Sequence, residues 1–277
     1  MTIPCTIKNE INKEVSSFFE RNIYRFTENG IPCMDKPVLR IAAADDPIFD
    51  FLGKDDTHPL MKPVDGFSLS FGKKKVAKSV LSWIIPVSQY ARLSNSEKKE
   101  EPSRAWTLSR HHGEIFNNAL RSFMTEYLFS KGYCAIAGQN ADWWKRFPDG
   151  VSSNWSERHA AYAAGHGSFS LCGGLITEKG IAVRIGSVIT DCLLKPDERL
   201  VSGIFDYCLY FSKGTCGACI RRCPAQAISP DGLNRIKCKG ILFGDKSRLL
   251  AEKHGGSLTA GCGLCQTGVP CEHQIPV

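Results

Sequence analysis

The sequence lacks any long hydrophobic run, since no stretch approaches the roughly 20 apolar residues that a helix needs to cross a bilayer. Its start, MTIPCTIKNEINKEV, has neither a basic segment followed by an apolar one nor a twin-arginine pair, so it does not resemble a secretory signal. Internal repeats and low-complexity segments are also absent, which excludes a repeat architecture. We therefore expect a cytoplasmic protein with no membrane partner.

The composition is that of a folded chain. Of the 277 residues, 43% are hydrophobic and 23% are charged, and the length suffices for one large domain or for two domains. The net charge of +7 is not gathered into one tract, although GKKKVAK (residues 72–78) and IRRCP (residues 220–224) are denser in basic residues. Such patches favour nucleic acid or an acidic electron-donor protein, and an ordinary solvated surface is equally compatible with them.

The 13 cysteines are many for a chain without a secretory signal, and they indicate metal binding or catalysis rather than disulfides. Cys5, Cys33, Cys134, Cys172 and Cys192 are scattered singly. Eight others fall in the last 70 residues, and eight thiolates are what two [4Fe-4S] clusters require: Cys208, Cys216, Cys219, Cys223, Cys238, Cys262, Cys265 and Cys271.

The stretch KGTCGACIRRCPAQAI (residues 213–228) resembles the end of a ferredoxin motif, C-x2-C-x3-C-P, without its first cysteine. In two-cluster ferredoxins the cysteine before proline binds the other cluster. This assigns Cys216 and Cys219 to cluster one and Cys223, which precedes Pro224, to cluster two. The later stretch GCGLCQTGVPC supplies a second C-x2-C pair and one further cysteine.

Pseudo-symmetry between the two motifs gives each cluster three ligands, and the remaining cysteines complete both sets. The predicted ligands of cluster one are Cys208, Cys216, Cys219 and Cys271, and those of cluster two are Cys223, Cys238, Cys262 and Cys265. Cys208 is flanked by apolar residues, so a core role is an alternative that would leave cluster one a [3Fe-4S] or labile cluster. A zinc ribbon is a second alternative, but it accounts neither for the Cys-Pro signature nor for the surplus cysteines.

Hydrophobic periodicity predicts helices over residues 7–28 and 111–132, and a shorter one after Ser156 that ends at Gly165. Strands are expected at residues 37–44, 79–87 and 133–138, and a hairpin or strand pair over residues 171–190 that turns at residues 178–180. Helices and strands alternate up to about residue 200, where a cysteine-punctuated region begins. The fold class expected is α/β (α+β), with domains at residues 1–200 and 201–277.

Residues 156–198, SERHAAYAAGHGSFSLCGGLITEKGIAVRIGSVITDCLLKPDE, resemble the core of epoxyqueuosine reductases and the related reductive dehalogenases. That family pattern runs roughly E-R-x-A-A-x-x-A-G-L-G-x-x-G, L-I-T, G-S or G-E, and T-D-L. A two-cluster ferredoxin domain follows it, with a lone cysteine between the C-x2-C motifs, as Cys238 is here. The earlier segments VLRIAAADDP and SVLSWIIPV resemble strands of the same family.

The resemblance implies a nitroreductase-like domain that holds a base-off cobalamin, followed by a ferredoxin-like domain whose nearer cluster reduces the cobalt. It also implies a low-potential electron donor such as ferredoxin or flavodoxin. Glycines let backbone approach a large planar ligand closely, and hydroxyls offer hydrogen bonds, although such glycines also simply form turns. The cofactor-binding residues predicted on this basis are Arg158, Gly165, Gly167, Ser168, Gly186, Ser187 and Thr190.

The chain departs from the family at the predicted proton donor and at its C-terminal end. Where those reductases carry an R-D-Y-H-like motif with a proton-donating Asp, this chain reads LSRHHGEIF, so His111 and His112 are the predicted catalytic residues. A solvated helix N-terminus is the alternative for this pair. His166, between two glycines, is either an axial ligand of cobalt or an ordinary loop histidine. The chain also ends six residues after its last cysteine, where the reductases commonly carry a tRNA-facing domain.

The leading interpretation is a corrinoid- and iron–sulfur-dependent reductase of a small or medium organic substrate. A second interpretation is an electron-transfer protein that reduces a partner, for example a corrinoid protein. A third is epoxyqueuosine reduction in tRNA, which makes tRNA a less favoured partner than a small molecule.

Overall fold

The computed structural model describes residues 4–52, 58–257 and 259–277. Its centre is an antiparallel sheet with the strand order β3-β4-β8-β5, in which β3 is Val38–Ala43, β4 is Ser79–Pro86, β8 is Val183–Thr190 and β5 is Ala135–Ile136. Strand β4 pairs with β3 on one side and with β8 along its whole length on the other. Every residue of β4 is therefore buried, which explains why SVLSWIIP shows no alternation of apolar and polar residues.

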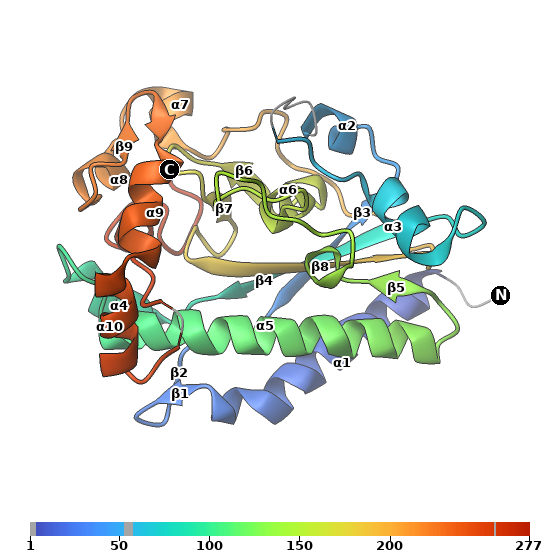
Figure 1. The fold of residues 1–277 in the computed structure, drawn as a ribbon. Helices are drawn as coiled ribbons and strands as arrows, with labels where there is room; N and C mark the ends of the chain where they lie inside the picture. The colour runs from blue at the N-terminus through green and yellow to red at the C-terminus, as the bar shows by residue number, and fades with distance from the viewer. Residues whose placement is uncertain (1–3, 53–57, 258) are drawn as a thin grey trace.

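Helices cover both faces of this sheet (Figure 1). Alternate strand residues such as Leu81 and Trp83 pack against α1 (Pro4–Asn22) and α5 (Arg104–Ser130). The intervening residues, among them Val80, pack on the other face against α3 (Pro63–Phe71) and α6 (Glu157–Ala163), with α2 (Ile48–Leu52) beside them. In the part of the chain that the structure describes, no helix combines the length and the apolar character needed to span a membrane.

Helix α5 begins earlier than the sequence pattern predicts. Its first residue is Arg104, and the Ser103 side chain caps it by accepting a hydrogen bond from the Trp106 backbone N–H at 3.1 Å. His111 and His112 therefore lie inside the helix rather than at its start. The first predicted helix is confirmed as α1, but it ends at Asn22, and a single 3-10 turn and the short hairpin of β1 (Thr27–Glu28) and β2 (Ile31–Pro32) follow.

The hairpin predicted over residues 171–190 is wrong. Strand β7 (Leu175–Thr177) pairs with β6 (Gly167–Phe169) in a separate two-stranded sheet, whereas β8 joins the central sheet. The chain does turn at Gly180, which has φ 76°, but the backbone of the next residue, Ile181, does not pair with a neighbouring strand. The Ile181 backbone N–H donates to the Cys271 carbonyl at 2.8 Å, so a contact with the distant C-terminal segment replaces the local pairing.

The cysteine-rich segment is built from short elements. They are α7 (Leu209–Lys213), α8 (Ala218–Arg221), the hairpin of β9 (Ile228–Ser229) and β10 (Gly232–Leu233), α9 (Arg235–Phe243), α10 (Asp245–Lys253) and a 3-10 turn at Leu264–Gln266. Its apolar core also contains Leu171 and Ile176, which precede residue 200. A domain boundary at residue 200 stays a prediction.

Arg222 fastens this segment to α4 (Gln89–Ser96). Its guanidinium donates to the carbonyls of Ser96 and Lys98, both at 3.0 Å, and to that of Thr267 at 2.8 Å. A nearby ion pair between Arg92 and Glu272, at 3.0 Å, joins the same two parts of the chain. The last carbonyls of α4, which lack partners within the helix, are thereby satisfied by the C-terminal segment.

His166 is buried beside strand β4 of the central sheet, with 3% of its surface exposed. Its Nε2 is 3.0 Å from the Ser82 carbonyl of β4, and its Nδ1 has no hydrogen-bond partner among the described residues. Burial lowers the pKa of His166 to about 4, so the ring is neutral at neutral pH. This placement makes His166 a packing residue of the fold.

Replacing His166 with Gln is expected to reduce the acid sensitivity of the fold. A neutral buried histidine contributes stability that is complete above the unfolded-state pKa of 6.5 and is lost as the pH falls toward 4. The loss over this range is on the order of 2–3 kcal/mol. Unfolding free energies of both proteins at pH 7 and pH 4.5 test this, and an equal loss in the two would contradict it.

Candidate functional site

The eight clustered cysteines divide between two cavities. Cys208, Cys216, Cys219 and Cys271 line the first, which we call the distal cavity. Cys223, Cys238, Cys262 and Cys265 line the second, which we call the central cavity. This division coincides with the two ligand sets predicted from spacing, while cluster ligation itself stays a prediction. No three His, Cys, Asp or Glu side chains in the described ranges form a site for a single metal ion.

The distal cavity is formed where α7 and α8 begin. Cys208 precedes the first residue of α7, and Cys216 and Cys219 flank Gly217, whose φ of 152° permits the sharp turn before α8. Cys208 is buried, as a core residue would be, but it faces the same cavity as the other three thiols. The structure therefore brings Cys208 to the place that the ligand prediction requires.

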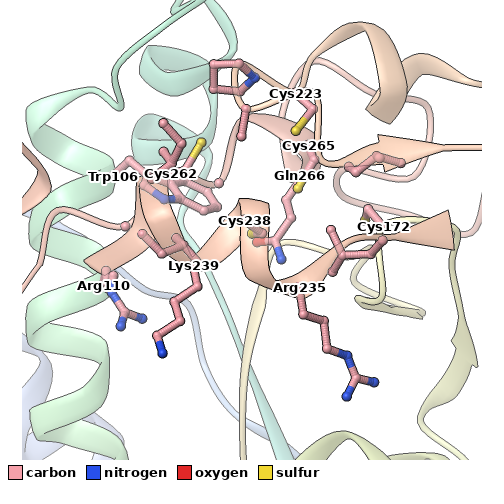
Figure 2. A pocket seen from close by; sticks show the side chains of 18 of the residues that line it. Trp106, Arg110, Cys172, Cys223, Arg235, Cys238, Lys239, Cys262, Cys265 and Gln266 are labelled. Atoms are coloured by element: carbon pink, nitrogen blue, oxygen red, sulfur yellow. The ribbon is translucent and has the colours of Figure 1, made fainter. Parts of the chain in front are cut away.

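Figure 2 shows the central cavity, where side chains from α5, α9 and the C-terminal loop converge. The Ala227 backbone N–H donates to the Cys223 Sγ at 3.2 Å, which fixes this thiol beside Pro224. Cys238 projects from α9, whose start is capped by the Asn234 side chain accepting from the Lys237 N–H at 3.0 Å. The first bond therefore fixes the Cys223 thiol, and the second fixes the start of the helix that carries Cys238.

Gly263 positions the other two thiols, Cys262 and Cys265. It has φ 65°, and a Cβ there would lie 2.0 Å from the indole ring of Trp106 on α5. Only glycine fits this backbone conformation and this contact without a large rearrangement. The Cys-x2-Cys loop is therefore pressed directly onto α5.

The thiols of Cys238 and Cys271 favour their neutral form in the absence of metal. Burial first, and the charges of neighbouring cysteines second, raise the pKa of Cys238 to about 11 and that of Cys271 to about 12. A metal binds thiolate, so iron must displace these protons. This arrangement suits a site that is completed only when a cluster is present.

The central cavity, of about 360 Å³, adjoins a larger one of about 680 Å³, which we call the arginine cavity. Both are lined by Arg110, Arg158 and Arg184, together with Phe243 and Gln266. The arginine cavity has six arginines on its wall and two carboxylates, Glu114 and Glu157. The central cavity, which holds four of the thiols, thus shares a wall with the strongly basic arginine cavity.

Arg184 is the cation of this wall with the least compensation. Among the described residues its guanidinium has no ion pair and no hydrogen bond, whereas that of Arg110 donates to the Thr259 hydroxyl at 3.3 Å and that of Arg158 to the Gly173 carbonyl at 2.7 Å. Burial and the repulsion of Arg110 lower the pKa of Arg184 to about 10, so it remains charged at neutral pH. A charged group in such surroundings favours an anionic or oxygen-rich ligand.

The two carboxylates flank Arg121, which is 1% exposed. Its guanidinium donates to Glu114 at 3.3 Å and to Glu157 at 3.2 Å. Glu157 also accepts a hydrogen bond of 2.5 Å from the Ser187 hydroxyl, and burial raises its pKa although Arg121 opposes this. A carboxyl group whose pKa is raised at a cavity wall is suited to donating a proton.

The predicted catalytic histidines are not on the wall of either cavity. His111 Nδ1 is 3.0 Å from the Ser257 hydroxyl, and the His112 ring packs 5.8 Å from that of Phe26. Arg110 and Glu114 line the arginine cavity instead. They are four residues apart, hence on one face of α5, while the histidines are rotated away by about 100° per residue. The spacing of Trp106, Arg110 and Glu114 was the signal for this face.

Of the predicted cofactor-binding residues, Arg158 lines both cavities. Gly165 lies against the Glu198 backbone, and Gly167 lies so close to Ile176 in the β6–β7 pair that a Cβ would clash. The Ser168 hydroxyl accepts from the Tyr207 N–H at 2.8 Å. These three residues have packing partners within the protein and do not line the two cavities.

The three β8 residues predicted to bind the cofactor also contact other residues of the protein. Gly186 lies beneath the Trp83 ring, Ser187 holds Glu157, and the Thr190 hydroxyl donates to the Cys134 carbonyl at 2.7 Å. Ser187 therefore acts on the arginine cavity through Glu157. Direct contact of these residues with a cofactor stays a prediction.

Gly186→Ala is expected to destabilise the fold. The new Cβ would lie 2.4 Å from Asn117 Oδ1 and 2.6 Å from the Trp83 ring, and overpacking of this kind costs about 1–3 kcal/mol. Gly240→Ala in α9 is the matched control, because no atom lies within 4 Å of a Cβ there. Thermal unfolding compares the two, and a fully stable Gly186→Ala would contradict the packing role.

No protein-family model matches the sequence. No curated protein sequence matches it either. The structure, in contrast, resembles solved structures, all at low sequence identity.

An epoxyqueuosine reductase matches with a TM-score of 0.53 and 21% identity over 98% of this chain and 66% of that one. The epoxyqueuosine reductase of Bacillus subtilis matches with a TM-score of 0.50 and 19% identity over 99% of this chain and 68% of that one. A reductive dehalogenase described as performing B12-dependent dehalogenation matches with a TM-score of 0.55 and 16% identity over 87% of this chain.

These likenesses confirm the mixed fold that the alternation of helices and strands predicted, and they confirm the resemblance to epoxyqueuosine reductases and reductive dehalogenases. The chain spans 66% of the first reductase and 30% of the dehalogenase, so each of those proteins has further parts. At such identities the comparison establishes the fold.

Proposed function

We propose that this protein is an oxidoreductase in which two [4Fe-4S] clusters deliver electrons to a corrinoid in the arginine cavity, where an organic substrate is reduced. The observation that carries the proposal is the wall shared by the four thiols of cluster two and the basic cavity. Cluster one would receive electrons from a low-potential donor such as ferredoxin or flavodoxin.

The residues of the two cysteine sets fit the clusters. Each set offers four thiols on one cavity, which is the ligand number of a [4Fe-4S] cluster. Arg158 lies close enough to Cys238 for their charges to interact. A positive charge beside a cluster favours its reduced form, so Arg158 would raise the reduction potential of cluster two.

The arginine cavity fits a corrinoid through residues other than the predicted glycines. Guanidinium groups and the Gln266 amide can donate hydrogen bonds to the amide oxygens and the phosphate of a corrinoid. When bound, a corrinoid supplies a strongly reducing cobalt centre. Contact of Gly165 and Gly167 with the corrinoid stays a prediction.

The chain's own residues would then bind and orient the ligands and protonate the substrate. Arg110 and Arg184 would hold anionic or carbonyl groups at the cavity wall, and Phe243 would exclude water from one side. Glu157, or Glu114 across Arg121, would provide the proton from its carboxyl oxygen in place of the histidine pair.

Iron content tests the two ligand sets. Anaerobically reconstituted protein is expected to hold about eight irons per chain. Cys216→Ser and Cys262→Ser are each expected to lose about four, because each removes a ligand of a different cluster. Cys134→Ser, outside both cavities, is the control. Loss of the same cluster in both variants, judged by EPR, would contradict the assignment.

Titration with cob(II)alamin, followed by EPR, tests whether the protein binds a corrinoid. We expect the signal to change from base-on to base-off when the protein binds it, and Arg184→Gln to weaken binding about tenfold because a charged hydrogen bond is lost. Arg184→Lys should retain part of the affinity. An unchanged base-on signal with both clusters intact would refute the corrinoid and leave an electron-transfer protein that reduces a partner.

A further inference from the structure

The arginine cavity carries more positive charge than the protein itself compensates. Its wall holds six arginines and two carboxylates, and both carboxylates pair with the same arginine, Arg121, at 3.3 and 3.2 Å. Arg248 has only an exposed partner, Asp245, at 3.5 Å. The other four arginines of the wall have no ion pair among the described residues: Arg110, Arg146, Arg158 and Arg184. A cavity lined by cations without counter-charge attracts an anionic ligand.

Close contacts with glycine fix the stems of two of these arginines. A Cβ at Gly113 of α5 would lie 3.3 Å from Arg184 Cγ, and a Cβ at Gly261 would lie 2.3 Å from Arg110 Cδ. Both guanidinium groups nevertheless keep free donors, because each has five N–H groups and Arg110 uses one of them, on the Thr259 hydroxyl. Donors that are held in place beforehand need little further ordering when a ligand binds.

Arg146 and Arg248 distinguish the arginine cavity from the central cavity, since of these two cavities they line only the first. Arg146 belongs to the loop before α6, and its guanidinium lies 5.9 Å from the centre of the Trp144 ring and donates to the Gly150 carbonyl at 3.3 Å. Arg248 projects from α10. Both side chains are exposed, so they lie where the cavity meets solvent.

The backbone on either side of this opening is anchored to the rest of the protein. Asn154, which is 3% exposed, accepts a hydrogen bond of 2.8 Å from the N–H of the residue before Arg146. The residue before Arg248 is the buried Ser247, whose hydroxyl accepts from the Ala260 N–H at 3.2 Å. Two cations are therefore held at the opening by neighbours that do not depend on a ligand.

We propose that the substrate reduced in the arginine cavity is a small organic anion with a carboxylate or phosphate group. Arg146 and Arg248 would attract this group from solvent, and Arg184 would hold it. A guanidinium presents paired N–H donors that match the oxygens of both groups. The volume of about 680 Å³ suits a small molecule. Glu114 and Glu157 on the same wall would repel a long polyphosphate chain.

This inference rests on the proposed function, because it names the substrate class of the same cavity. The charged group of the substrate serves recognition and takes no part in the reduction. Arg146 and Arg248 do not line either of the cavities that hold the clustered cysteines. Substitutions of these two arginines therefore test recognition of the anion without removing a predicted cluster ligand.

Isothermal titration calorimetry with three probes of similar size tests the inference. The full chain is reconstituted anaerobically with its clusters and cob(II)alamin in a chloride buffer. Benzoate carries a carboxylate, phenyl phosphate carries a phosphate, and benzamide is neutral. We expect both anions to bind more tightly than benzamide and to lose affinity as the salt concentration rises. The tighter of the two anions identifies the group that the cavity prefers.

Arg146→Gln and Arg248→Gln are each expected to weaken anion binding about three- to tenfold, because a charged hydrogen-bond donor is lost, and to leave benzamide binding unchanged. Arg25→Gln is the matched control. Arg25 is also exposed and also lies over an aromatic ring, that of Tyr24 at 5.5 Å, but it belongs to the 3-10 turn after α1 and does not line the arginine cavity.

Anion affinities no higher than that of benzamide would overturn the inference. Anion binding that Arg146→Gln and Arg248→Gln weaken no more than Arg25→Gln does would also overturn it. So would a protein that binds a tRNA stem-loop through these arginines and binds neither small anion. Missing iron or an unchanged base-on cobalt signal in the same samples would instead refute the proposed function, whatever the anion affinities are.

Discussion

The contact between the C-terminal cysteine loop and α5 is the constraint on which the site depends. Gly263 lies against the Trp106 ring, and Gly261, with φ 65°, lies against the side chain of Arg110. Both glycines have backbone that other residues adopt at a cost, and both leave no room for a Cβ. Because α5 is also one wall of the main core, this contact joins the thiols rigidly to the sheet.

The same contact explains the electrostatics of the interior. The central cavity brings Arg110, Arg158 and Arg184 beside its four cysteines, and the positive charge of the wall that it shares with the arginine cavity is only partly compensated by Glu114 and Glu157. Cations that gather at a cavity wall repel one another until negative charge compensates them. Thiolates bound to iron, and an anionic or oxygen-rich ligand, would both supply it. The proposed clusters and corrinoid would therefore compensate the positive charge of this wall.

The sequence and the structure disagree where local pattern and packing compete. The hairpin over residues 171–190 fails because Ile181 bonds to Cys271, a residue far away in the chain. The pair His111 and His112 does not reach the cavities because Arg110 and Glu114, four residues apart, lie on the face of α5 that lines the arginine cavity. In each case the decisive partner lies on an element that the local sequence does not contain.

The sequence by itself determined the buried strands, the two long helices and the sorting of eight cysteines into two sets. Hydrophobic period and cysteine spacing are local properties, and a C-x2-C loop can serve one site whatever surrounds it. Tertiary structure alone decided that Arg158 and Arg184 share a wall with Cys238, and that Cys172 lies between the two sets. Those neighbours come from α6, β8, α9 and the turn after β6, and only long-range packing brings such elements together.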